Sequence, residues 1–209
     1  GFALLNERSH ALADACKKNA GAMLALLGAT HEDAQSVCDA CAEGDVLVCA
    51  NYNAPGQVVV SGNVAAIDRA EAYWKEQSKR CSRLRTAGAF HSPLMEDAAT
   101  RVGEFCKTLS FKQPTFPLIC NTDAQPFVVD EATDRLSSQV KSSVMFEQSI
   151  QALSTKGESQ FIEVGFGGVL TNLVKRIDRK ADRIKIGTYV EWEKEVSQLV
   201  SSVEESNKE

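Results

Sequence analysis

The residue best suited to proton transfer in this sequence of 209 residues is His91. It lies in the run Gly88-Ala89-Phe90-His91-Ser92-Pro93, a loop that opens a predicted helix. The positive end of that helix disfavours a charge on the imidazole ring. A general base has to be unprotonated at the working pH, so this position suits His91 to that role. From position alone, a surface histidine beside a helix cap explains the same pattern.

The neighbouring Ser92 is interpreted as structural rather than catalytic. A serine followed by Pro93 is typical of an N-cap and the first helical position. Adjacent side chains generally point apart, so a Ser–His pair is not expected here. The sequence contains no G-x-S-x-G, the turn that exposes a nucleophilic serine. The chain therefore has a candidate base and no identifiable nucleophile.

Two other motifs are also given structural interpretations. Cys38 and Cys41 form one C-x-x-C on a predicted helix, and a zinc site would need a second ligand pair that we do not find. The Gly-Phe-Gly-Gly run at residues 165–168 follows a predicted strand, but it fits neither the dinucleotide-binding nor the P-loop pattern. We expect tight packing at both motifs, with no metal ion and no nucleotide.

The composition is that of an ordinary globular protein, with 44% apolar and 24% charged residues. A net charge of −5 argues against nucleic-acid binding, and no apolar run is long enough for a membrane span. Seven cysteines at spacings without a disulfide framework favour a reducing compartment, so we expect a cytoplasmic location. The first residue is Gly1 rather than Met, which suggests a fragment.

The pattern of residues 22–86 is β-α-β-β-α-β, the order of a ferredoxin-like unit. The expected strands are 23–27, 46–52, 57–61 and 81–84, and the expected helices are 31–42 and 64–76. Pro55-Gly56 between the two middle strands suits a type II turn and predicts a hairpin.

Outside that unit, helices and strands alternate, which predicts an α/β layer with a mostly parallel sheet. Residues 2–19 are expected to form a helix with Phe2, Leu5, Ala13 and Cys16 on one face. Further helices are expected from Ser92 to about residue 109, within 131–155, at 169–177 and at 191–203, with strands at 116–120, 161–164 and 184–189. The polar tail at 204–209 is expected to fray.

Three segments together resemble the malonyl-CoA:acyl-carrier-protein transacylases and the related acyltransferase domains of polyketide synthases. Residues 51–62, NYNAPGQVVVSG, resemble the family's hairpin motif N-x-N-x-P-G-Q-x-V-x-S/A-G. Residues 88–95, GAFHSPLM, resemble the segment around its catalytic histidine, and residues 163–170, EVGFGGVL, resemble its E-V-G-P-G-x-V-L. The three occur in the family's order and span most of the chain, so the joint match is specific.

The resemblance implies an α/β-hydrolase-like large domain with an inserted ferredoxin-like small domain. Residues 22–86 would be the small domain, and residues 1–21 and 87–209 the later part of the large domain. It also implies transfer of a malonyl group from malonyl-CoA to the phosphopantetheine thiol of acyl carrier protein through a seryl intermediate, as in fatty-acid biosynthesis, with no cofactor.

The same resemblance implies roles for four side chains. His91 corresponds to the base that takes the serine's proton, and Gln139 to the position that orients it. Arg8 corresponds to the arginine that grips the malonyl carboxylate, a role that suits its planar fork of donors. Phe90 belongs to the Gly-Ala-Phe-His form of the motif, in which a bulky ring crowds an α-methyl group.

The chain departs from the family in ways that affect its expected activity. It lacks the nucleophile motif G-H-S-x-G-E and the early G-Q-G-S-Q, so we expect the 209 residues alone to be inactive and to expose apolar surface. Phe166 replaces a proline, and Phe146 stands where a tryptophan is frequent; both look like packing changes. The alternative is a non-catalytic module that binds a small molecule or a carrier protein.

Two clusters of basic residues are candidate docking sites for an acidic carrier protein. The first lies around the end of the ferredoxin-like unit, with Arg80 and Arg83 at its centre. The second lies between 175 and 185 and includes Lys175, Arg176, Arg179 and Lys180. A solvated helix end, with cations favourably placed at its C-terminus, explains the second cluster equally well.

Overall fold

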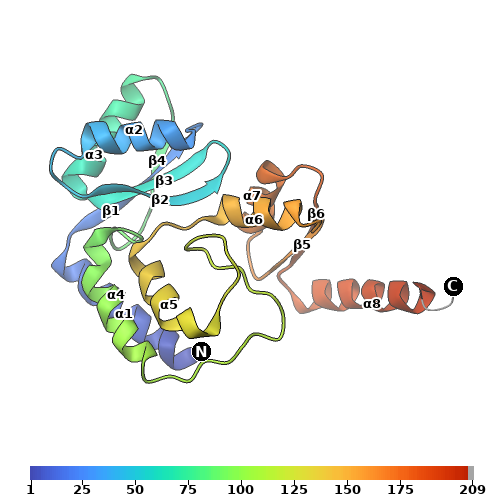
Figure 1. Cartoon of the computed structure of the whole chain (residues 1–209). Helices are drawn as coiled ribbons and strands as arrows, with labels where there is room; N and C mark the ends of the chain where they lie inside the picture. Colours follow the sequence, from blue (N-terminus) through green and yellow to red (C-terminus); the bar gives the residue numbers. More distant parts are fainter. Residues whose placement is uncertain (207–209) are drawn as a thin grey trace. The chain divides into compact units, whose positions relative to one another are not determined.

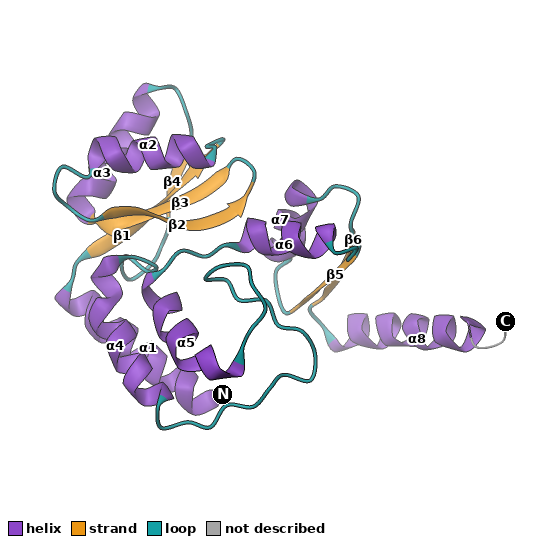
Figure 2. Ribbon diagram, viewed as in Figure 1, coloured by secondary structure: helices purple, strands orange, loops and turns teal. Residues whose placement is uncertain are grey.

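A computed structural model describes residues 1–206 of the chain, with side chains as far as residue 197. The chain divides into two compact units, Gly1–Ser149 and Ile150–Glu209, which are treated separately below (Figure 1). Both units combine helices and strands (Figure 2). Of the tail expected to fray, residues 204–206 belong to the last helix, and residues 207–209 lie outside the described part.

The first unit contains a four-stranded antiparallel sheet with the order β2-β3-β1-β4. Its strands are β1 (Gly21–Leu27), β2 (Leu47–Ala54), β3 (Gln57–Asn63) and β4 (Cys81–Arg83). Two helices, α2 (His31–Cys41) and α3 (Val64–Glu76), cover one face of the sheet (Figures 1 and 2). The β-α-β-β-α-β order predicted for this region is confirmed, with strand ends that differ by at most two residues.

Local chemistry explains why these elements form where they do. The Thr30 hydroxyl accepts a hydrogen bond from the Asp33 amide at 3.1 Å, and the Asp33 carboxylate accepts one from the Thr30 amide at 3.1 Å. These two hydrogen bonds form a capping box at the start of α2. Gly56 has a φ of 73°, as the third position of a type II turn requires, and Ala54 pairs with Gln57 across it. The predicted hairpin is therefore confirmed.

Strand alternation buries both faces of this sheet. Val58 and Val60 of β3 point into the core beneath α2 and α3, together with Trp74. Val59 points the other way and packs with Met23, and Phe90 contacts this second cluster. The loop that carries His91 is thus anchored against the sheet face opposite the two helices.

Three helices form the rest of the first unit: α1 (Phe2–Lys18), α4 (Glu96–Cys106) and α5 (Ala132–Lys141). The predicted packing face of α1 was wrong, because Phe2 is 84% exposed and Leu5 is 57% exposed. The buried positions are Ala11 and Ala15, whose small side chains pack in one cluster with α4 and α5. Of the four predicted residues, Cys16 alone lies on the packed face.

The region between α4 and α5 contains no strand at 116–120, contrary to the prediction. One isolated bridge joins Ile119 to Pro126, and the Cys120 amide donates to the Gln125 carbonyl at 2.9 Å. Pro114 and Pro117 lack the amide hydrogens that a strand ladder needs, which accounts for the irregular backbone. The helix that follows Ser92 also differs, since it begins with the short helix η1 (Pro93–Met95) and ends at Cys106 rather than 109.

The second unit contains a β-α-β arrangement. The strands β5 (Gln160–Val164) and β6 (Asp182–Ile186) pair in parallel, and α7 (Val169–Ile177) connects them. The helix α6 (Phe146–Thr155) spans the boundary between the units, and α8 (Tyr189–Ser206) ends the described chain. The parallel pairing predicted for this region is confirmed, with β6 and α8 beginning two residues earlier than expected.

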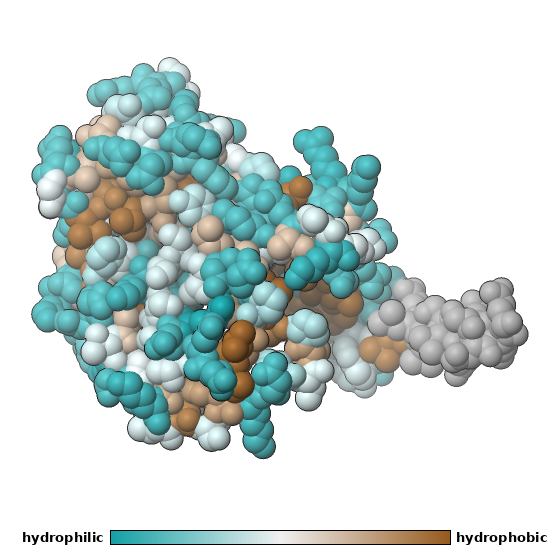
Figure 3. Space-filling model, viewed as in Figure 1, coloured by the Kyte–Doolittle hydropathy of each residue, from teal (hydrophilic) through white to brown (hydrophobic). Residues whose placement is uncertain are grey.

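Large apolar side chains are exposed on the second unit. Phe166 is 91% exposed, Val164 81% and Val190 73%. The space-filling view shows apolar patches that interrupt an otherwise polar surface (Figure 3). Exposed apolar surface was expected from the sequence, and it is found on both units, including the surroundings of the two-stranded sheet.

Candidate active site

A cavity of about 390 Å³ brings together residues that are far apart in the sequence. It is lined from α1, β1, β2, α5 and the loop after β4. Its lining residues are Arg8, Leu12, Met23, Asn51, Leu84, Thr86, Phe90, His91 and Val140. Three of the residues predicted for the site, Arg8, Phe90 and His91, therefore share one cavity.

His91 is held by two main-chain carbonyl groups. Its Nδ1 lies 3.0 Å from the Gln139 oxygen and 3.1 Å from the Ser142 oxygen. Carbonyl oxygens only accept hydrogen bonds, so Nδ1 carries the proton and Nε2 keeps its lone pair in the neutral ring. Within the described residues, Nε2 has no hydrogen-bond partner. The ring is therefore arranged to accept a proton at Nε2.

Burial lowers the pKa of His91 below its usual value of 6.5, because desolvation disfavours the charged ring. The carbonyl contacts act in the opposite direction, and the nearby charge of Arg8 lowers the pKa slightly further. The direction agrees with the neutral imidazole expected from the sequence, although burial is the main cause rather than the helix end. His91 has a φ of 57°, a left-handed conformation that histidine adopts more readily than most residues.

Ser92 has the structural role predicted for it. Its hydroxyl donates a hydrogen bond to the Ala89 carbonyl at 2.6 Å and accepts one from the Leu94 amide at 3.3 Å. The Ser92 side chain is fully buried. The hydroxyl is thus committed to the turn that starts η1, and the interpretation as an N-cap is confirmed.

Arg8 has no counter-ion among the described residues, unlike Arg101 and Arg135 of the same unit. Arg101 pairs with Glu7 and Asp14, and Arg135 pairs with two carboxylates of its own. The Arg8 guanidinium makes no ion pair or hydrogen bond with any described residue. A half-buried, uncompensated guanidinium beside a cavity is suited to binding an anion, above all a carboxylate.

Gln139 contacts His91 through its main chain and not through its side chain. Its side-chain amide donates to the Ser142 carbonyl at 3.3 Å and the Ser143 carbonyl at 3.5 Å, and it lines a separate cavity of about 170 Å³. The side chain therefore shapes the turn that presents the carbonyls. Sequence reasoning missed Ser142, because a role played by a backbone oxygen leaves no residue-type signal.

The other motifs carry no ligand site. The Glu163 carboxylate accepts hydrogen bonds from the Gly168 amide at 3.2 Å and the Thr171 amide at 2.8 Å. It therefore already occupies the N-terminus of α7, where a phosphate group would bind. Cys38 and Cys41 are buried, and the Cys38 sulfur lies 3.9 Å from that of Cys49. Among the residues that the structure describes, no group of three or more metal-binding side chains comes together, and no helix is long and apolar enough to cross a membrane.

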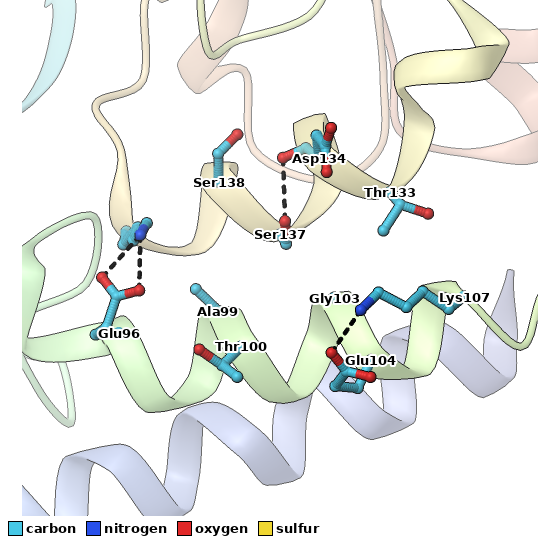
Figure 4. Close-up of a pocket in the computed structure, with 11 residues that line it drawn as sticks. Glu96, Ala99, Thr100, Gly103, Glu104, Lys107, Thr133, Asp134, Ser137 and Ser138 are labelled. Atoms are coloured by element: carbon cyan, nitrogen blue, oxygen red, sulfur yellow. Dashed lines mark hydrogen bonds and ion pairs between the residues drawn. The ribbon is translucent and has the colours of Figure 1, made fainter.

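A second cavity, of about 320 Å³, lies between α4 and α5, away from His91 (Figure 4). Its charged groups are already paired: Lys141 donates to both oxygens of Glu96 at 2.7 Å, and Lys107 donates to Glu104 at 2.7 Å. Gly103 lets the helices approach, since a Cβ there would lie 3.3 Å from the Ser137 Cβ. The Lys141–Glu96 pair joins the two helices, whereas the Lys107–Glu104 pair lies at the end of α4. Both lysines that line the cavity are therefore already paired.

The two basic clusters differ in how far their charges are compensated. In the first, Arg83 is paired with Asp68 and Glu71, and Lys79 with Asp33, whereas Arg80 is exposed and unpaired among the described residues. In the second, all four predicted residues are exposed around the C-terminal end of α7: Lys175, Arg176, Arg179 and Lys180. The second cluster thus presents more of its charge to solvent.

Comparisons with known proteins identify the family of this chain. Residues 8–208 match the acyl transferase domain family. The chain is 36% identical over 187 residues to the malonyl CoA-acyl carrier protein transacylase of Bacillus subtilis (strain 168), which covers 87% of this chain and 58% of that protein.

Two solved structures extend the likeness to the fold. The malonyl CoA-acyl carrier protein transacylase of Clostridium perfringens has a TM-score of 0.89 at 26% identity, over 98% of this chain and 65% of its own. A malonyl-transacylase in complex with its type II polyketide synthase acyl-carrier protein has a TM-score of 0.86 at 27% identity, over 90% of this chain and 62% of its own. The chain spans about three-fifths of the relatives it matches, and it belongs to the acyl transferase domain family.

Proposed function

We propose that this chain forms the later part of a malonyl-CoA:acyl-carrier-protein transacylase. The observation that carries the proposal is that a histidine with a free Nε2 and an arginine without a counter-ion line the same cavity. The transacylase relatives support the choice of reaction. The β1–β4 unit with α2 and α3 would be the ferredoxin-like small domain, residues 22–86, inserted in an α/β-hydrolase-like large domain, residues 1–21 and 87–209.

In this proposal the nucleophile is a serine from outside these 209 residues. His91 Nε2 takes the proton of the serine hydroxyl as its oxygen attacks the thioester carbonyl of malonyl-CoA. The C–S bond then breaks, CoA leaves, and the imidazolium returns the proton to the CoA sulfur. The carbonyls of Gln139 and Ser142 favour the charged ring formed between these steps.

The second half-reaction repeats the chemistry with a different thiol. His91 Nε2 takes the proton of the carrier's phosphopantetheine thiol as the sulfur attacks the seryl ester. The ester bond breaks, the malonyl thioester of the carrier forms, and the proton returns to the serine oxygen. Both half-reactions balance without a cofactor or a metal ion. Fatty-acid biosynthesis is the proposed pathway, and the free thiols of all seven cysteines favour a cytoplasmic setting.

A transfer assay on the complete protein tests the proposal directly. With malonyl-CoA alone, mass spectrometry should detect a malonylated serine, and adding holo acyl carrier protein should move the malonyl group to the carrier. An apo carrier without phosphopantetheine is the control and should stay unmodified. Binding of malonyl-CoA without either covalent product would instead favour the non-catalytic binding module.

The carrier protein is proposed to dock on exposed basic residues. Carriers of this pathway are acidic, so the exposed charges of Arg179 and Lys180 in the second cluster are suited to steering them. Arg80 offers the corresponding charge in the first cluster. The neutralised Arg83 is a weaker candidate, because Asp68 and Glu71 already compensate its charge.

Charge reversal at these positions should separate carrier docking from chemistry. Arg179→Glu with Lys180→Glu should raise the KM for the carrier at low salt by about tenfold, and the effect should shrink as salt screens the charges. The half-reaction with malonyl-CoA should stay nearly unchanged. Arg80→Glu should act in the same way, and Arg83→Glu more weakly. Unchanged carrier kinetics in every variant would identify both clusters as solvated surface.

A further inference from the structure

A short segment links the small sheet to the candidate base. Residues 142–147, called here the 142–147 segment, comprise the connection that follows α5 and the first two residues of α6. Val144 in this segment pairs with the edge strand β2. The Tyr52 amide donates to the Val144 carbonyl at 2.9 Å, and the Val144 amide donates to the Ala50 carbonyl at 2.8 Å. Asn51, which lines the cavity, forms a parallel bridge with Val144. Val144 therefore adds a short backbone pairing along β2, at the edge of the four-stranded sheet.

Two side-chain contacts secure this pairing at either end. The Ser143 hydroxyl donates to the Cys49 carbonyl of β2 at 2.6 Å. The Glu147 carboxylate, whose side chain is 8% exposed, contacts His31 Nε2 at 3.1 Å. His31 is the first residue of α2, and its ring packs edge-on against Tyr52, with 4.6 Å between ring centroids. Helix α2, strand β2 and the segment are thus joined side by side.

The opposite side of the same segment holds His91. The Ser142 carbonyl accepts a hydrogen bond from His91 Nδ1, and so does the Gln139 carbonyl. Ser142 directly precedes Ser143 in the sequence. A displacement of the segment from β2 would move the Ser142 oxygen and change its distance to Nδ1. The Gln139 carbonyl, which belongs to α5, would then be the one remaining acceptor for Nδ1. With one acceptor in place of two, the Nδ1–H tautomer would be less strongly favoured over the Nε2–H tautomer.

We propose that Ser143 and the His31–Glu147 pair are positioning residues, which hold the 142–147 segment on β2 so that the Ser142 carbonyl keeps His91 in the Nδ1–H tautomer. The consequence for catalysis rests on the proposed function, but the positioning itself does not. This positioning gives the small sheet a part in the proposed chemistry, because strand β2 holds the segment whose Ser142 carbonyl contacts His91.

The tautomer of His91 can be read from ¹⁵N NMR spectra of the 209-residue chain labelled at histidine. The chain has three histidines, and variants at His10 and His91 assign the signals. The unaltered chain should show His91 protonated at Nδ1. Ser143→Ala and Glu147→Leu should each shift His91 toward the Nε2–H form, and should speed hydrogen exchange of the Tyr52 and Val144 amides about fivefold, as expected for the loss of one hydrogen bond.

Conservative variants and a matched control separate positioning from general destabilisation. Ser143→Thr and Glu147→Gln keep a hydrogen-bonding group at each place and should restore the Nδ1–H tautomer. Glu104→Leu removes a carboxylate from an exposed ion pair with Lys107 on α4 and should leave His91 unchanged. In the complete enzyme, Ser143→Ala and Glu147→Leu should lower kcat by roughly 10- to 100-fold with little change in the KM for malonyl-CoA.

The two proposals fail in different ways. If His91 stays protonated at Nδ1, with unchanged amide exchange, in both Ser143→Ala and Glu147→Leu, the positioning role is wrong whatever the enzyme does. If the complete protein transfers no malonyl group, the proposed function is wrong, and the NMR spectra still decide whether the segment positions the ring.

Discussion

Replacing His91 with alanine in the complete protein should lower the rate of acyl-enzyme formation by a factor on the order of 10²–10⁴. The serine would lose the group that removes its proton, and within the described residues no other histidine lines the cavity. Rapid-quench measurement of CoA release from malonyl-CoA gives the rate of this step directly. Binding of malonyl-CoA should change little, because Arg8 remains in place.

His10→Ala is the matched control, because His10 is exposed on α1 and should leave the rate unchanged. The pH profile gives a second check. The pKa of His91 is lowered from 6.5 by burial, so the ring stays neutral to lower pH than an exposed histidine. The rate should therefore fall as the pH is lowered and the ring gains a proton, with a midpoint below pH 6.5. Near-normal transfer by His91→Ala would disprove its role as the base.

Replacing Arg8 with alanine should change which acyl group the complete protein accepts. The malonyl carboxylate would lose its charged partner, and kcat/KM for malonyl-CoA should fall about 10- to 100-fold, the usual loss for hydrogen bonds to a charged group. Acetyl-CoA has no carboxylate and should be little affected. The ratio of the two kcat/KM values, measured in competition, should therefore shift toward acetyl-CoA.

Two further variants sharpen this prediction. Arg8→Lys keeps the charge but loses the paired donors, so it should restore only part of the preference for malonyl-CoA. Lys17→Ala removes an exposed cation from the same helix and should have no effect. Equal losses with malonyl-CoA and acetyl-CoA would show that Arg8 does not bind the carboxylate.

Phe90→Ala should open the cavity to methylmalonyl-CoA. Phe90 lines the cavity, and in the proposed function its ring would crowd an α-methyl group.

The small sheet could be predicted because its signals are local. Turn chemistry at Pro55-Gly56, the run of valines in β3 and the cap at Thr30 act over a few residues and agree with one another. The packed face of α1 could not be predicted in the same way. Large side chains such as Phe2 and Leu5 suggested one face, whereas the small Ala11 and Ala15 set the real contact.

The irregular chain around 116–120 shows a second limit of local reasoning. Its apolar residues are typical of a strand, yet Phe116 is 72% exposed and the backbone makes only an isolated bridge. A strand needs a partner with free donors and acceptors, and whether one lies alongside depends on the whole fold.

The sequence by itself determined the chemical groups: a histidine at the start of a helix, an arginine on α1 and a serine committed to a cap. Only the tertiary structure decided how they work together. Folding brings Arg8, Asn51 and His91 to one cavity, although they belong to different elements. It also selects the proton-bearing nitrogen of His91 through two carbonyl oxygens, which every residue type possesses. Burial sets the direction of the pKa, and burial is a property of packing rather than of any single residue.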